Sequence, residues 1–181
     1  MFWNIGKESM KNYKLSKWEL FWIIAAIIIL VGLFISSSMT YHEQKIQPGF
    51  LNRHFAFLEH YLSGLQINYG GKMHSASLNG SAAFTEFVIR KFAHFATYFL
   101  LGVTLYLASK PVYRLKIVSP INSWLMIVGL AALDEYHQYL TGDRTPSVHD
   151  VMLDASGALV GILLVVIIQL IIYAVKRAKQ S

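Results

Sequence analysis

Four long apolar runs dominate the sequence and limit what it can fold into. They cover residues 20–36, 87–108, 121–139 and 155–175. A helix needs roughly 20 apolar residues to cross the hydrocarbon core of a bilayer, and each run is close to that length. Hydrophobic residues make up 55% of the chain and charged residues only 14%, whereas soluble domains usually carry about 25% charged residues. The sequence therefore predicts an all-α integral membrane bundle of four transmembrane helices.

Basic residues gather at the ends of these runs and give the chain its net charge of +6. Lys and Arg are frequent within residues 7–17, 110–116 and 176–179, and sparse between the first two runs. Because cytoplasmic loops are enriched in Lys and Arg, we expect both termini and the 110–116 loop in the cytoplasm. This clustering is typical of a multi-pass membrane protein, and it does not favour binding to nucleic acid.

The runs also divide the chain. Residues 1–19 are interpreted as a cytoplasmic basic arm, residues 20–175 as a single membrane domain, and residues 176–181 as a cytoplasmic basic tail. A cleaved signal peptide is the competing interpretation of the N-terminus, although the first run exceeds the roughly 7–15 apolar residues of such signals. The chain has no cysteine, which excludes disulfides and thiol chemistry.

An outer segment, residues 40–80, joins the first two runs. Within it, apolar residues recur at helical spacing, namely Leu51, Phe55, Leu58, Leu62 and Leu65. This stripe fits an amphipathic helix that lies on the bilayer surface. It fits equally well a helix that packs against the transmembrane helices.

Local signals predict where the helices begin and end. The second helix should run from Ser81 to Ser109, and the third should have Ser119 as its N-cap, followed by a proline. Ser147 is followed three residues later by Asp150, which is typical of a capping box at the start of the fourth helix. The third and fourth helices should therefore form an antiparallel hairpin with a tight outer turn.

Each of the last three predicted helices carries one polar stripe when residues are placed at intervals of 100°. The members are Glu86, Arg90, Lys91 and His94 on the second helix, Asp134, Glu135 and Gln138 on the third, and Asp150 and Asp154 on the fourth. Counting about 20 residues from each cytoplasmic end places all three stripes at one level near the outer leaflet. Ionisable groups at membrane depth are costly and normally face the bundle interior, so the stripes predict a binding or catalytic site.

Two structural explanations compete with a functional one. The charged groups could pair with one another and hold the helices together, for example Glu86 with Arg90, or Asp134 or Asp150 with Arg144. Separately, Gly157 and Gly161, together with Gly102 and Gly129 on other helices, are typical of close helix packing.

Several motifs occur in order on the predicted helices. They are Arg90-Lys91-x-x-His94-Phe95-x-x-Tyr98, Asp134-Glu135-x-x-Gln138, and Arg144-x-x-Ser147-x-x-Asp150 followed by Gly157 and Gly161. This arrangement, with the serine-rich stretch 36–38, resembles the VanZ-like family over residues 20–165. One departure is Asp154, which stands where that family usually has Asn and adds a negative charge. The resemblance implies a membrane protein without an established reaction. The founding member of the family is associated with low-level resistance to teicoplanin, a glycopeptide with an acyl tail.

The first functional hypothesis is an outer-leaflet pocket that binds an amphiphile. The ligand would be a lipid head group, a lipid-linked cell-wall precursor or an acylated glycopeptide. The predicted ligand-binding residues are Arg90, Lys91, His94, Asp134, Glu135, Gln138, Arg144, Ser147, Asp150 and Asp154. Among them, arginine suits bidentate contacts with phosphate.

The second hypothesis is an intramembrane enzyme acting on a lipid-linked envelope substrate. Its catalytic candidates are His94, Asp134 and Glu135. It is motivated by the excess of acids over fixed cations in the polar stripes. Oxygen ligands favour Mg²⁺, Mn²⁺ or Ca²⁺, and the candidate ligands are Asp134, Glu135, Asp150 and Asp154. A scaffold subunit without a ligand is the third hypothesis, and the sequence leaves open whether the chain is an enzyme.

Overall fold

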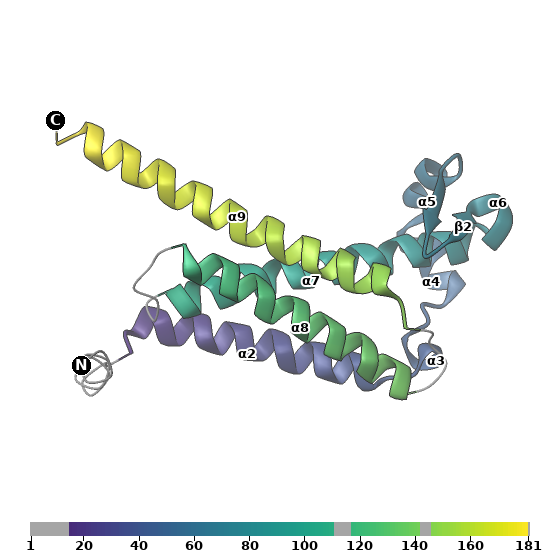
Figure 1. The fold of residues 1–181 in the computed structure, drawn as a ribbon. Coiled ribbons are helices and arrows are strands. Elements are labelled where there is room, and N and C mark those ends of the chain that lie inside the picture. Colours follow the sequence, from purple (N-terminus) through teal and green to yellow (C-terminus); the bar gives the residue numbers. More distant parts are fainter. Residues whose placement is uncertain (1–14, 111–116, 142–145, 181) are drawn as a thin grey trace.

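The computed structural model describes residues 15–110, 117–141 and 146–180 (Figure 1). Four parts of the sequence lie outside the described residues: residues 1–14 of the predicted basic arm over 1–19, residues 111–116, residues 142–145, which include Arg144, and Ser181. The elements are α2 (Lys17–Ser38), α3 (Tyr41–Gln44), α4 (Pro48–His54), α5 (Ala56–Leu62), β1 (Gln66–Tyr69), β2 (Lys72–Ser75), α6 (Ala76–Asn79), α7 (Ser81–Ser109), α8 (Val118–Leu140) and α9 (Val148–Ala178). The fold is mostly helical, as the apolar runs predict.

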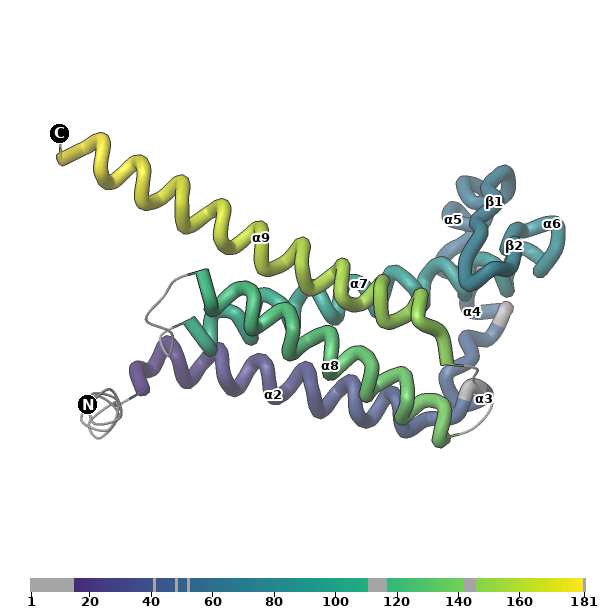
Figure 2. Tube along the Cα trace, in the orientation of Figure 1, coloured from purple at the N-terminus to yellow at the C-terminus, as the bar shows by residue number. Residues whose placement is uncertain are grey.

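The four long helices lie side by side and alternate in direction along the chain (Figure 1). α2 and α8 run one way, while α7 and α9 run the other (Figure 2). Packing contacts join α7 to α9, α8 to α9 and α2 to both α7 and α8. The end of α2, the end of α8 and the start of α9 therefore meet at one end of the bundle, and both described termini lie at the other.

The outer surface of the bundle is apolar. Three helices in the described part of the chain, α2, α7 and α9, are long and apolar enough to cross a membrane. Large aliphatic side chains are exposed along these helices. Ile28 on α2 is 65% exposed and Leu170 on α9 is 62% exposed. Exposure of such extended apolar surfaces to water would be unfavourable, whereas the lipid tails of a membrane would cover them. The structure is that of a membrane protein.

Glycines hold α7 and α9 close together, as the sequence predicts. A Cβ at Gly157 would overlap the carbonyl oxygen of Phe95, and one at Gly161 would overlap that of Phe99. Gly102 on α7 likewise faces the backbone of Ala158. The prediction is wrong for Gly129, where an added Cβ would meet nothing within 4 Å, because that part of α8 faces outwards.

The outer segment differs from the single amphipathic helix that its stripe allows. The helix breaks at Phe55, which ends α4 and precedes α5. Leu51 and Leu62 are buried and α4 and α5 pack on α7, so part of the stripe contacts the bundle, while Leu65 is 49% exposed.

A β-hairpin follows, so the chain is not strictly all-α. β1 and β2 pair antiparallel, with Tyr69 opposite Lys72. The two residues between them, Gly70 and Gly71, have φ angles of 62° and 74°. A two-residue turn with both φ angles positive favours glycine and matches the twist of the strands.

Candidate functional site

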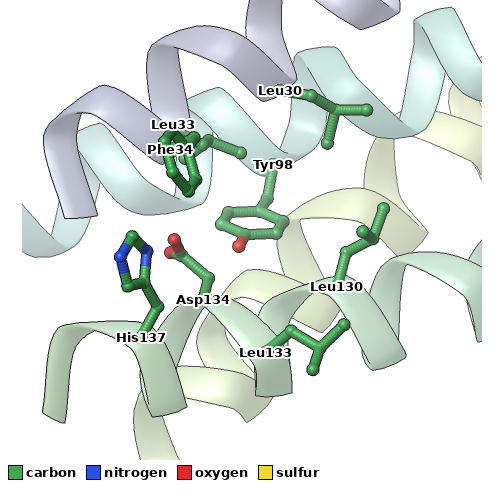
Figure 3. Close-up of a pocket in the computed structure, with 8 residues that line it drawn as sticks. All are labelled: Leu30, Leu33, Phe34, Tyr98, Leu130, Leu133, Asp134 and His137. Atoms are coloured by element: carbon green, nitrogen blue, oxygen red, sulfur yellow. The ribbon is translucent and has the colours of Figure 1, made fainter. Parts of the chain in front are cut away.

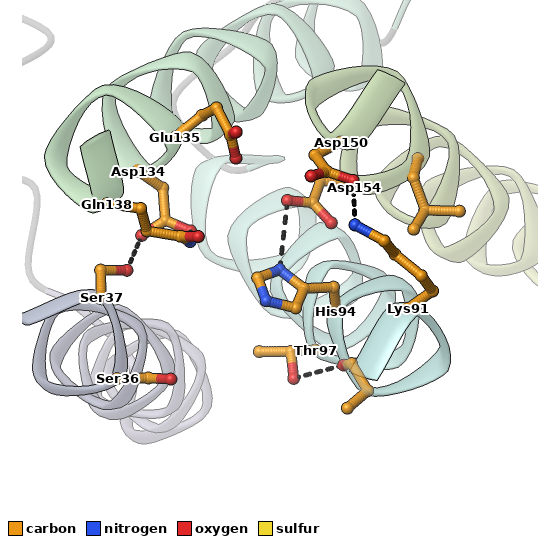
Figure 4. A network of polar contacts seen from close by, with 12 residues as sticks. Ser36, Ser37, Lys91, His94, Thr97, Asp134, Glu135, Gln138, Asp150 and Asp154 are labelled. Atoms are coloured by element: carbon orange, nitrogen blue, oxygen red, sulfur yellow. Dashed lines mark hydrogen bonds and ion pairs between the residues drawn. The ribbon is translucent and has the colours of Figure 1, made fainter. Parts of the chain in front are cut away.

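Polar side chains from all four long helices converge near the end of the bundle where α8 ends and α9 begins (Figure 4). The members are Ser37 on α2, Lys91 and His94 on α7, Asp134, Glu135 and Gln138 on α8, and Asp150 and Asp154 on α9. Asp134 and Asp154 each stand six residues from the end of their helices, or about 9 Å at 1.5 Å per residue. Asp134 and Asp154 therefore lie at a similar height in the bundle, as the sequence predicts for the polar stripes of their helices.

Asp134 is held by neutral donors from two helices. The Ser37 hydroxyl donates to Oδ1 of Asp134, and Nε2 of Gln138 donates to Oδ2 at 3.1 Å. The Thr141 hydroxyl also donates to the Ser37 carbonyl at 3.2 Å. These contacts fix the carboxylate and join the ends of α2 and α8.

His94 and Asp154 form an ion pair across the α7–α9 seam when the imidazole is protonated. Nδ1 of His94 lies 3.5 Å from Oδ2 of Asp154. Asp154 is only 4% exposed, and its Oδ1 has no hydrogen-bond partner among the described residues. A buried carboxylate oxygen without a donor is unfavourable and needs an explanation.

Asp150 connects the β-hairpin to the bundle. Its Oδ1 accepts hydrogen bonds from the Tyr69 hydroxyl and from Nζ of Lys91, and Nζ of Lys91 lies 4.7 Å from the centroid of the Tyr69 ring. Burial raises the pKa of Tyr69 well above its ordinary value, and the hydrogen bond to Asp150 adds to the rise. The phenol therefore stays protonated and remains a donor.

The side chain of Glu135 binds the backbone at the start of α9. Its Oε1 accepts from the backbone N–H of Ser147 at 2.7 Å. The predicted capping box is wrong in detail: Ser147 is the N-cap residue of α9, but its side chain makes no capping bond. The carboxylate of Asp150 accepts from Lys91 rather than from the Ser147 N–H, which donates to Glu135. The N-cap prediction for Ser119 is also displaced, since α8 begins at Val118.

The pairing alternative is confirmed for Glu86 and Arg90, which form an i,i+4 ion pair at 3.7 Å. The pairing predicted for Arg144 involves a residue outside the described part of the chain. Lys91, Arg90 and His94 are thus each engaged with an acid. Among the described residues, the cations that a phosphate ligand could use at this site are therefore each paired with an acid.

One group in the described chain has donor atoms close enough to share a metal ion. It consists of His94, Asp134 and Asp154, whose donor atoms lie within 4.8 Å of one another. We call this group the trio. It overlaps only in part with the predicted set of four acids, because Glu135 and Asp150 are engaged with Ser147 and Lys91.

An apolar pocket of about 380 Å³ adjoins the trio between α2 and α8 (Figure 3). We call it the α2–α8 pocket. Its lining residues are Leu30, Leu33, Phe34, Tyr98, Leu130, Leu133, Asp134 and His137. Asp134 lies at one end, where Phe34 stacks on His137 with ring centroids 5.0 Å apart. Asp134 therefore belongs to both the trio and the pocket.

Sequence reasoning missed several contributors to this site. The aliphatic lining of the pocket carries no signal that separates it from lipid-facing residues. Ser37 lies in the serine-rich stretch noted in the family resemblance, but nothing in the sequence indicates that it contacts Asp134. Tyr69 lies in the outer segment, 81 positions from its partner Asp150, and no periodicity links the two.

Comparison with known proteins gives one match. The family model for VanZ/LLP1 matches residues 21–169. No curated protein matches the chain, and no solved structure does either. The match covers most of the chain, including most of each of the four long helices and every residue of the site. The chain belongs to the VanZ/LLP1 family.

Proposed function

We propose that this protein binds an amphiphile, with the apolar part in the α2–α8 pocket and the polar head beside Asp134. The α2–α8 pocket is the observation that carries the proposal. At about 380 Å³ it falls within the roughly 300–1,000 Å³ of small-molecule sites, which are mostly apolar with a few polar groups that orient the ligand. Six of its lining residues are aliphatic or aromatic hydrophobics, and its polar groups gather at the end near Asp134.

The polar end indicates the chemistry of the head group. Asp134 is a hydrogen-bond acceptor when ionised, and the nearby cations are engaged with acids. A head group with hydroxyl or amine donors fits this end better than a bare phosphate. Lipid-linked cell-wall precursors and acylated glycopeptides both combine such donors with an apolar chain.

The proposal includes a topology. In addition to the three apolar helices α2, α7 and α9, α8 also spans the membrane, since it packs against all of them, and it forms a hairpin with α9. Lys17 begins α2, and Lys176 and Arg177 lie in the last turn of α9. Because cytoplasmic ends are enriched in basic residues, both termini are cytoplasmic and the site faces the outer leaflet of a bacterial plasma membrane.

Filling the pocket tests the binding proposal. Purified protein is mixed with lipids extracted from its host and examined by native mass spectrometry. Leu130→Trp places a large ring in the pocket, whereas the control Leu125→Trp adds the same ring to the exposed face of α8. We expect retained amphiphile to fall about tenfold or more in Leu130→Trp, which corresponds to about 1.4 kcal/mol of binding free energy.

The control should retain amphiphile as the wild type does. Equal retention by both variants would contradict binding in the pocket. Absence of any bound amphiphile in the wild-type protein would contradict the proposal as a whole.

In the cell, we expect amphiphile binding to confer resistance to acylated glycopeptides. Expression in a susceptible strain should raise the inhibitory concentration of teicoplanin but not that of a glycopeptide without an acyl tail. Leu130→Trp should abolish the difference, and Leu125→Trp should preserve it. Equal protection against both drugs would show that the acyl chain is not what the protein recognises.

A second candidate function is favoured by the His94–Asp154 pair. An imidazole oriented by a buried carboxylate is a common arrangement for proton transfer, and Asp134 lies within reach of both. An enzyme acting on a lipid-linked substrate would lose activity in His94→Ala. If His94→Ala and Glu135→Gln fold, insert and leave the lipid profile of the cell unchanged, this candidate fails.

A further inference from the structure

We propose that the trio of His94, Asp134 and Asp154 binds one divalent transition-metal ion, of which Mn²⁺ and Zn²⁺ fit best. The inference does not rest on amphiphile binding, because the three ligands can hold an ion whether or not the α2–α8 pocket is filled. The metal site would lie inside the bundle, among the polar side chains of the site.

The separations within the trio suit a shared ion. Ligand atoms lie about 2.0–2.2 Å from such ions, so two neighbouring donors are about 3.0–3.5 Å apart. Nδ1 of His94 and Oδ2 of Asp154 are 3.5 Å apart, and the whole trio lies within 4.8 Å. Small side-chain rotations would bring all three donors onto one ion. They come from α7, α8 and α9, so the ion would tie three helices together.

Two buried polar atoms next to the trio lack partners and point to a ligand. Oδ1 of Asp154 and the hydroxyl of Tyr98 have no hydrogen-bond partner among the described residues. Tyr98 is fully buried, and its hydroxyl points towards Asp134 (Figure 3). Buried polar groups are nearly always satisfied by protein, water or an ion. An ion with a bound water at this place would satisfy both atoms.

The local charge also favours a dication. Asp134 is half-buried and Asp154 is buried, and carboxylates inside a bundle are costly unless opposite charge compensates them. The neighbouring Lys91 pairs with Asp150, and the contacts shown for Asp134 come from the neutral side chains of Ser37 and Gln138. An ion of charge +2 would balance Asp134 and Asp154 and leave His94 neutral, which is the form that coordinates metals.

The donor types narrow the identity of the ion. Carboxylates suit Mg²⁺, Ca²⁺ and Mn²⁺, whereas imidazole suits Zn²⁺ and other transition metals. One imidazole with two carboxylates favours Mn²⁺ or Zn²⁺ over Ca²⁺. Ser37 and Gln138 orient Asp134 in the manner of the hydrogen-bonded outer shell around known metal ligands.

Manganese provides the test, because its electron paramagnetic resonance signal reports both binding and ligand type. Full-length protein in lipid-free detergent is treated with a chelator, dialysed and titrated with Mn²⁺, and Zn²⁺ is then added as a competitor. We expect one site per chain, with nitrogen coupling from an imidazole in the pulsed spectrum. His94→Ala should remove this coupling, and His94→Ala and Asp154→Asn should each weaken binding by about tenfold or more.

Two variants of the same chemistry serve as controls. His60→Ala removes an exposed histidine of α5, and Glu43→Gln removes an exposed carboxylate that contacts Thr40. Neither residue belongs to the trio or to the polar cluster around it. Both should bind Mn²⁺ within about twofold of the wild type. Wild-type protein that binds neither ion, or binds Mn²⁺ without nitrogen coupling, would overturn the proposal without any variant. Equal weakening by trio and control variants would overturn it as well.

Discussion

Asp134 connects the two binding proposals at the level of a single residue. It lines the end of the α2–α8 pocket and also belongs to the trio, while the Ser37 and Gln138 side chains hold its carboxylate in place. A ligand head group and a metal ion would therefore contact the same carboxylate. Substitutions around Asp134 can separate the two proposals.

Asp134→Asn should weaken both Mn²⁺ and amphiphile binding, because the amide keeps the shape of the side chain but removes its charge. Asp154→Asn should weaken Mn²⁺ binding alone, and Leu130→Trp should weaken amphiphile binding alone. Paramagnetic resonance and native mass spectrometry on the same three preparations measure this pattern. Identical losses in all three would indicate a folding defect rather than two linked sites.

Ser37 is a positioning residue for Asp134. Ser37→Ala removes the hydroxyl that donates to Oδ1, and the loss of such an outer contact typically weakens metal binding by about 10–100-fold. The matched control is Ser38→Ala, since the Ser38 hydroxyl bonds only to the carbonyl of Phe34 on its own helix in the contacts shown. A Mn²⁺ titration distinguishes the two variants, and equal affinities would exclude a role for Ser37.

Tyr69 gives a prediction for alkaline pH. Its pKa is raised by burial and by the bond to Asp150, so the folded protein keeps this phenol protonated above pH about 10, where an unfolded tyrosine ionises. Its contribution to stability is complete below that pH and is lost as the pH rises further. At pH about 11, Tyr69→Phe should leave the phenolate absorbance of the folded protein unchanged, yet lower that of the denatured protein by one tyrosine. A drop in the folded protein would contradict the raised pKa.

At the scale of elements, the α7–α9 seam depends on its glycines. Gly157→Ala would push a methyl group into the carbonyl of Phe95, and overpacking of this kind costs about 1–3 kcal/mol of unfolding free energy. Gly129→Ala adds the same methyl group where nothing lies within 4 Å, and it should stabilise α8 by up to about 1 kcal/mol through helix propensity. Thermal unfolding in detergent should show opposite shifts, and two equal shifts would contradict close packing at Gly157.

The elements also show what local sequence can predict. The long helices follow from their apolar runs, and the α7–α9 seam follows from the spacing of Gly157 and Gly161. Capping residues near position 147 were placed correctly, but their hydrogen bonds were not, because Glu135 from another helix reaches the backbone of Ser147. The break at Phe55 could not be predicted, because it depends on the packing of α4 and α5 on α7. The β-hairpin does carry a local signal, the glycine pair Gly70-Gly71, but the helical stripe from Leu51 to Leu65 led to a helix as the prediction for this segment.

For the whole molecule, the absence of cysteine makes the proposed topology easy to test. Gly64→Cys lies in the outer segment, where an added side chain meets nothing within 4 Å, and Gln180→Cys lies exposed beyond α9. In intact cells, a membrane-impermeant maleimide should label Gly64→Cys but not Gln180→Cys, and permeabilised cells should show both labelled. The reverse pattern would place the site at the inner leaflet.

The packing of the whole molecule decides which parts of the site can be predicted from the sequence. Helical periodicity and depth bring His94, Asp134 and Asp154 to one level, because each helix repeats regularly and all must cross the same bilayer. The α2–α8 pocket depends instead on how the apolar side chains of two neighbouring helices pack. In the sequence, Leu30 and Leu130 cannot be distinguished from leucines that face lipid. Only the packing of α2 beside α8 shows that they line the pocket.

Photo-crosslinking tests the proposed amphiphile site most directly. Protein is illuminated with a lipid whose acyl chain carries a diazirine, and the labelled residues are located by peptide mass spectrometry. We predict labelling concentrated at Leu30, Leu33 and Leu130, and its loss in Leu130→Trp but not in Leu125→Trp. Labelling spread evenly over the exposed apolar residues of α2 and α9, unchanged in both variants, would contradict the account.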